Sequence, residues 1–175
     1  MVGVSENMSN KKYEHWCDDK HQEPKDDNKF VIGDMADQIY ADLEQYILQD
    51  INKDLLVVFS DDMQGNISKR YVLHKTTNIL DNAENLATIV IDANNIYAMY
   101  EVDFKRRREL WLEARGLCFR LIKQLKNISS IMVEGTNIKK YVRLSKELSK
   151  LANKIKNVMI ADDKKKKEHC KEYFH

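Results

Sequence analysis

Apolar residues recur every three or four positions over most of the chain, which is the period of one face of an α-helix. The first row begins near Ile32 and runs toward Asp61, with Asp34 as the expected N-cap. Gly65 lies in the polar stretch 61–66 that ends this row, so we expect a turn there. The row consists of Ile39, Leu43, Ile47, Ile51, Leu55 and Val58.

Three more rows predict helices over about residues 68–97, 103–126 and 137–160. In the second helix the expected core positions are Leu73, Ile79, Leu80, Ala83, Leu86, Ala87, Val90, Ile91, Asn94 and Tyr97. In the third they are Phe104, Trp111, Ala114, Cys118, Leu121 and Leu125, and in the fourth Tyr141, Leu144, Leu148, Leu151, Ile155 and Val158. Near-heptad spacing and short connections predict an all-α fold, an antiparallel up-down four-helix bundle.

The bundle is expected to occupy residues 32–162. Residues 1–31 are polar, lack a helical period and are interpreted as a flexible N-terminal tail. Residues 163–175 are interpreted as a charged, basic C-terminal extension exposed to solvent.

Composition agrees with one helical domain. The chain has 175 residues, of which 43% are apolar and 33% charged, and only 5 Gly and 1 Pro to mark turns. The longest apolar run, Leu55–Phe59, is too short to span a membrane, and the first residues do not resemble a secretion signal. Three widely spaced cysteines do not suggest a disulfide framework. We therefore expect a cytoplasmic protein with reduced thiols.

Charge is divided unevenly along the chain. Residues 1–62 hold 6 Lys/Arg and 15 Asp/Glu, whereas residues 63–175 hold 23 Lys/Arg and 13 Asp/Glu. Within the second part, residues 104–160 contain 15 basic and 4 acidic residues. An asymmetry of this size favours a polyanionic partner or charge-complementary self-association.

The basic residues of the third and fourth helices form the candidate binding site. Cationic side chains spaced along one helical face bind backbone phosphates and release counterions. The alternative is an ordinary solvated, lysine-rich helix surface. The predicted nucleic-acid-binding residues are Lys105, Arg106, Arg107, Arg108, Arg115, Lys123, Lys126, Lys139, Lys140, Arg143, Lys146, Lys150 and Lys154.

Other candidate sites are weaker. Phe59-Ser60-Asp61-Asp62 resembles a polymerase palm motif, but it continues a helical row and lacks a second acidic strand. Cys118 is expected to be an inert core thiol, His74 a packed or capping histidine, and Trp111 and Tyr97 core aromatics. The tails contain possible zinc ligands without compact spacing: His15, Cys17, His21, His169, Cys170 and His175. We therefore predict no catalytic residue, no metal and no cofactor.

The order of these features resembles a family of four-helix bundles. The family includes the accessory variability determinant of diversity-generating retroelements and the ribosomal-RNA intervening-sequence proteins. The segments that carry the resemblance are Ile67–Leu73, Ala83, Leu86 and Ala93–Asn94, then Arg108–Ala114 and Cys118–Leu121, and finally Tyr141–Ile160. The resemblance covers about residues 35–165. It implies a homopentamer without enzymatic activity that binds a reverse transcriptase and its template RNA.

These observations leave two hypotheses. The first is a non-enzymatic accessory protein that binds RNA or RNA/DNA through its third and fourth helices and assists a reverse transcriptase. The alternative is a self-assembly or protein-interaction module, in which the acidic first helix of one subunit pairs with basic helices of another. An enzyme of another type is the least favoured interpretation.

Overall fold

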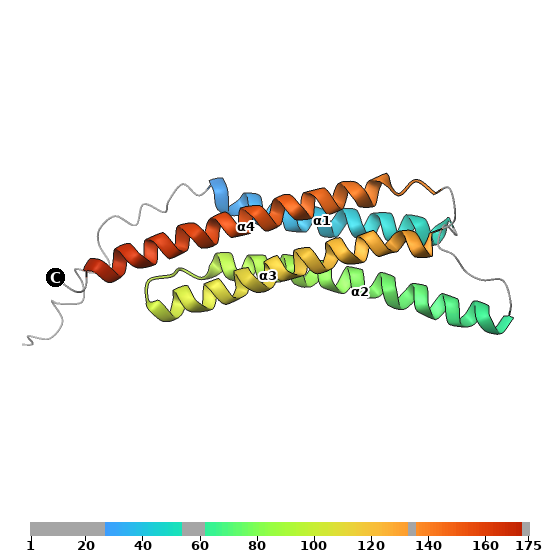
Figure 1. The fold of residues 1–175 in the computed structure, drawn as a ribbon, viewed down its shortest axis with the longest axis horizontal. Coiled ribbons are helices and arrows are strands. Elements are labelled where there is room, and N and C mark those ends of the chain that lie inside the picture. Colours follow the sequence, from blue (N-terminus) through green and yellow to red (C-terminus); the bar gives the residue numbers. More distant parts are fainter. Residues whose placement is uncertain (1–26, 54–61, 133–135, 173–175) are drawn as a thin grey trace, which may run out of the picture.

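The computed structural model describes residues 27–53, 62–132 and 136–172, and these residues form four long helices and one short 3-10 helix. Figure 1 shows the long helices side by side, with consecutive helices pointing in opposite directions. The prediction of an all-helical four-helix bundle is confirmed. The elements are α1 (Asp27–Asn52), α2 (Asp62–Asn95), α3 (Glu101–Asn127), η2 (Ile128–Ile131) and α4 (Lys139–Glu172).

The core lies where the four helices meet. α3 packs against α2 and α4, and α1 also packs against α2 and α4. All of the core positions predicted for α3 are buried, and Trp111 and Cys118 are completely so. In α4 the predicted row is buried from Tyr141 to Ile155, and Val158 is half-buried at its edge. Burying each of these large apolar side chains contributes about 1.5–3 kcal/mol, so the inner faces hold the bundle together.

The predicted core row of α2 is partly wrong. The predicted core residues Leu73 and Ile91 are 62% and 44% exposed, whereas Val72, which was not predicted, is buried. Ile79 is buried as predicted. Leu73, Leu80 and Ala87 are spaced by sevens, and such a row drifts around a straight helix by about 20° per heptad. Leu73 therefore lies beyond the buried face that Ala87 still reaches. Tyr97, also predicted to be in the core, follows the end of α2 and is exposed.

The predicted core row of α1 is correct through Ile47 and then fails. Ile51 is 39% exposed, and the neighbouring Asp50 is buried in its place. A carboxylate is stable there because two side chains of α4 bind it, as described below. The predicted core residues Leu55 and Val58 lie outside the described residues.

Helix ends also differ from the predictions. α1 begins at Asp27, so Asp34 lies inside the helix and does not cap it. α2 begins at Asp62, so Gly65 is a helical residue and not a turn. At the start of α4, the Oδ1 atom of Asn137 accepts a hydrogen bond of 3.0 Å from the backbone N–H of Lys139, as an N-cap side chain does.

α4 is longer than the sequence indicated. It continues past Ile160 to Glu172, so most of the predicted C-terminal extension belongs to this helix. The segment contains neither Gly nor Pro, and the buried Asp162 ties it to α3. Most of the predicted N-terminal tail, residues 1–26, lies outside the described residues.

Candidate nucleic-acid interface

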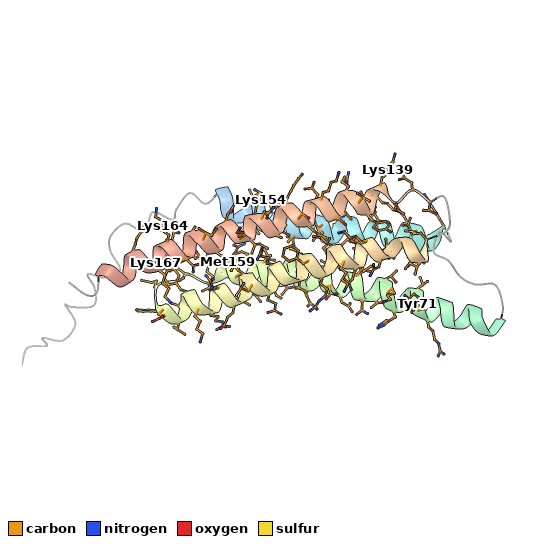
Figure 2. All side chains as sticks on the ribbon, viewed as in Figure 1. Tyr71, Lys139, Lys154, Met159, Lys164 and Lys167 are labelled. Atoms are coloured by element: carbon orange, nitrogen blue, oxygen red, sulfur yellow. The ribbon has the colours of Figure 1, made fainter. Side chains whose placement is uncertain are left out.

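The outer side of α4 carries most of the exposed predicted lysines. They lie opposite the buried row that contains Leu144, Leu148 and Leu151, because residues three and four apart share a helical face. Figure 2 shows labelled lysines along the length of this helix. The predicted members Lys139, Lys146, Lys150 and Lys154 are exposed, and so are Lys156, Lys164, Lys165 and Lys167. At about 100° per residue, Lys139, Lys146, Lys150 and Lys164 share one narrow face, and the other four flank it by about 60–100° on either side. We call these eight residues the α4 lysine face.

Three residues of this face were placed outside the bundle by the sequence prediction. Lys164, Lys165 and Lys167 were assigned to a solvent-exposed C-terminal extension, but the structure places them on the last turns of α4. The absence of a helix breaker after Ile160 was the signal available in the sequence. At 1.5 Å per residue the face extends about 42 Å, from Lys139 to Lys167.

Few carboxylates neutralise the α4 lysine face. Lys150 lies 2.8 Å from Glu147, and Lys164 lies 4.0 Å from Glu168. Both pairs are solvent-exposed neighbours on the same helix, and such pairs contribute only about 0.3–0.5 kcal/mol. A phosphate can therefore compete for either lysine at little cost.

The basic run 105–108 is split between two roles. Lys105 and Arg106 are exposed, whereas the Arg107 side chain is only 11% exposed. Its Nε lies 2.9 Å from Asp162 Oδ2, and its Nη1 donates a 3.1 Å hydrogen bond to the Ile96 carbonyl oxygen. Arg107 was predicted to bind nucleic acid, and the structure instead assigns it to the contact between α3 and α4. Arg108 is exposed but binds Asp163.

The basic run lies after the first turn of α3. α3 begins at Glu101, and the Asp103 carboxylate accepts a 3.0 Å hydrogen bond from the Tyr100 backbone N–H. Two acidic residues therefore occupy the first turn, where they interact favourably with the helix dipole. Lys166 donates to Glu101 at 2.8 Å, and this hydrogen bond lowers the pKa of the Glu101 carboxyl.

The remaining basic residues of α3 are dispersed. Arg115 is half-buried, and its guanidinium carbon lies 5.2 Å from the centroid of the Phe119 ring. Lys123 and Lys126 are exposed. Exposed Glu109 and Glu113 lie on the same helix, so α3 presents a mixed surface and no continuous basic row.

Two predicted residues of α4 turn toward α1. Lys140 binds the buried Asp50, and its Nζ lies 5.2 Å from the ring centroids of both Tyr46 and Tyr141. The Tyr141 hydroxyl also donates to Asp50. Burial, followed by this carboxylate, raises the pKa of the Tyr141 phenol. Lys140 is thus a packed side chain that already has an anionic partner.

Arg143 completes this contact between the helices. Its Nη2 lies 3.2 Å from Asp42 Oδ2 and donates a 2.8 Å hydrogen bond to the Tyr46 hydroxyl, although 61% of the side chain is exposed. The α1–α4 seam is the name used below for Asp42, Tyr46, Asp50, Lys140, Tyr141 and Arg143. The structure therefore does not gather all of the predicted residues on one surface.

The structure also places some of the weaker candidate residues. His74 is exposed, not packed, and its Nε2 lies 3.0 Å from the Asn78 amide nitrogen. Cys118 is buried, and burial raises the pKa of its thiol to about 12. Among the described residues no group of three or more His, Cys, Asp or Glu side chains is placed to hold a metal ion.

Several candidates lie beyond the described part of the chain. Phe59, Ser60 and Asp61 of the palm-like motif are outside it, and Asp62 begins α2. Among the proposed zinc ligands, His15, Cys17, His21 and His175 are also outside. In the described ranges no helix is both long and apolar enough to cross a membrane.

Comparison with known proteins gave no match. The chain fits no protein-family model, and no similar curated protein or solved structure was found. The resemblance to retroelement accessory proteins therefore stays a prediction.

Proposed function

We propose that this protein binds nucleic acid along the α4 lysine face and has no catalytic activity of its own. The supporting observation is a band of exposed lysines about 42 Å long, whose carboxylate partners among the described residues are weak, exposed ones. One strand of B-form DNA places a phosphate every 3.4 Å along the axis, so such a row spans about 12 phosphates. Contacts of this type hold the backbone and do not read the base sequence.

The partner enzyme is the second part of the proposal. The resemblance described above implies a reverse transcriptase and its template RNA, with this bundle as a non-enzymatic helper in a homopentamer. On this view the lysine face holds RNA or RNA/DNA while the polymerase performs the chemistry.

Binding of a fluorescent RNA across a salt series tests the proposal. We expect affinity to fall steeply with salt, because each neutralised phosphate releases counterions. Changing Lys150 and Lys154 to Gln is expected to weaken binding about tenfold at low salt and to flatten the salt dependence by about one to two units of slope.

A double variant of equal charge change serves as the control. Lys53, directly after α1, and Arg70, on α2, are exposed and do not belong to the α4 lysine face, so changing both to Gln removes the same number of positive charges outside it. This control is expected to lose less than twofold in affinity. Equal losses in the two double variants would show that net charge, and not the α4 lysine face, controls binding. No binding at low salt would favour the self-assembly module instead.

A further inference from the structure

A small pocket lies between α2 and the end of α3, away from the α4 lysine face. Its volume is about 190 Å³, less than the roughly 300–1,000 Å³ of sites for drug-sized ligands. Figure 2 labels Tyr71, which lines it, toward the same end of the bundle as Lys139. The lining residues are Tyr71, Lys75, Asn78, Ile79, Gln124, Asn127, Ile128 and Ile131.

The pocket combines an apolar inner surface with amide groups. Ile79, Ile128 and Ile131 are buried and supply the apolar part, which suits the face of a flat ring. Asn78, Gln124 and Asn127 supply amides, which carry both hydrogen-bond donors and acceptors. The Asn78 amide nitrogen also lies 3.0 Å from His74 Nε2, and its second N–H and its Oδ1 atom are the groups that would meet a ligand. Amide side chains pair with the donor and acceptor pattern on the edge of a nucleobase.

Neighbouring contacts leave Gln124 prepared to donate. Its Oε1 accepts a 3.1 Å hydrogen bond from the Asn82 amide nitrogen, so the NH₂ group is the part of Gln124 left for a ligand. Asn82 Oδ1 in turn lies 3.5 Å from Arg120 Nη1. The cationic side chain of Arg120, on α3, is therefore connected to Gln124 through Asn82.

Tyr71 and Lys75 supply stacking and charge. The Tyr71 residue is 50% exposed, and the Lys75 ammonium lies 5.2 Å from the centroid of its ring. An aromatic ring stacks on any base, and a nearby ammonium binds the phosphate of the same nucleotide. One nucleotide presents a flat ring, hydrogen-bonding edges and a phosphate, which match the three kinds of group in this pocket.

We propose that the α2–α3 pocket binds one unpaired nucleobase of the bound nucleic acid. This inference rests on the proposed function and adds a preference for single strands, because a base inside a duplex is stacked and cannot enter. Tyr71 stacks on the base, the Asn78 and Gln124 amides bind its edge, and Lys75 binds its phosphate.

The test compares two single-stranded oligomers of equal length and charge, one of adenosine RNA and one abasic backbone. The full chain is expected to bind the adenosine strand about tenfold more tightly than the abasic strand. Tyr71→Ala is expected to remove this difference and to leave abasic binding unchanged. Leu73→Ala is the control, since Leu73 is an exposed apolar residue of α2 that does not line the pocket.

Thermal melting of both variants is the control for folding. The other outcomes separate the proposed pocket from the proposed α4 lysine face. Equal binding of both strands by the unaltered protein, still dependent on Lys150 and Lys154, overturns the pocket and supports the lysine face. If neither strand binds, the proposed function fails. A titration with adenosine 5′-monophosphate then tests the pocket, while the side-chain amide NMR signals of Asn78 and Gln124 are followed. Shifts of both signals support the pocket, and the absence of such shifts overturns it.

Discussion

Lys139 and Lys140 are adjacent in the chain but belong to two regions with opposite properties. Lys139 is exposed on the α4 lysine face and has no ion-pair partner among the described residues. Lys140 lies in the α1–α4 seam, bound to Asp50 and beside two tyrosine rings. A step of one residue rotates the side chain by about 100° around the helix, which is enough to separate a binding residue from a packing residue.

Removing Asp50 is expected to give the largest effect, because it breaks the seam. Asp50→Ala leaves the Lys140 ammonium and the Tyr141 hydroxyl without their acceptor in a buried place. Breaking such a pair costs about 3–5 kcal/mol, and the 24% exposure of the Lys140 side chain reduces our expectation to about 2–3 kcal/mol. Urea denaturation measures the change in the free energy of unfolding.

Asp37→Ala is the matched control for Asp50→Ala. Asp37 is an exposed acidic residue of the same helix, and its replacement is expected to change the free energy of unfolding by less than about 0.5 kcal/mol. Equal effects at the two positions would show that the buried carboxylate does not stabilise the seam.

Alkaline pH is expected to give a smaller effect, through Tyr141. The pKa of this phenol is raised above its usual 10.0 by burial and by Asp50, so the folded chain holds a proton that the unfolded chain releases. Stability that is complete below pH 10 should therefore fall as pH rises above it, by at most about 1.4 kcal/mol per pH unit. Tyr141→Phe is expected to lower this slope.

Chemical denaturation at intervals between pH 9 and 11 measures the slope. Tyr100→Phe is the control, because Tyr100 is 68% exposed and meets water in both the folded and the unfolded chain. It should keep the slope of the unaltered protein. A slope unchanged by Tyr141→Phe would contradict the role given to the buried phenol.

The fold was largely predictable from the sequence because its information is periodic. Apolar rows in α3 and α4 identified the core, since most of their large buried residues recur at helical spacing. The sequence did not show which of two adjacent α2 residues faces the core, because Leu73 and Val72 are both apolar. Contacts with the other helices decide that Val72 is the buried one. Asp50 was not predictable either, since burial of a carboxylate depends on partners that are about ninety positions away in the chain.

For the candidate site, the sequence predicted which helices are rich in basic residues but not which of these residues are free to bind a ligand. The sequence identified the basic helices, but it treated Arg106 and Arg107 alike, whereas the structure pairs Arg107 with Asp162 and leaves Arg106 exposed. The pocket beside Tyr71 was not predicted at all. Its polar residues come from two helices, and no sequence motif marks amides that meet only after the bundle has formed.

The smallest expected effect concerns the two adjacent lysines themselves. Lys139→Gln removes one phosphate contact and is expected to weaken RNA binding about twofold to threefold, with the salt slope reduced by roughly 0.7–0.9. Its free energy of unfolding should be unchanged. Lys140→Gln is expected to show the reverse: unaltered RNA affinity and a loss of about 1 kcal/mol in stability, because Asp50 loses a partner.

Fluorescence anisotropy and urea denaturation of the same two samples separate these outcomes. If Lys140→Gln weakens RNA binding as much as Lys139→Gln, Lys140 must leave Asp50 to reach the phosphates, and the seam would then open when RNA binds.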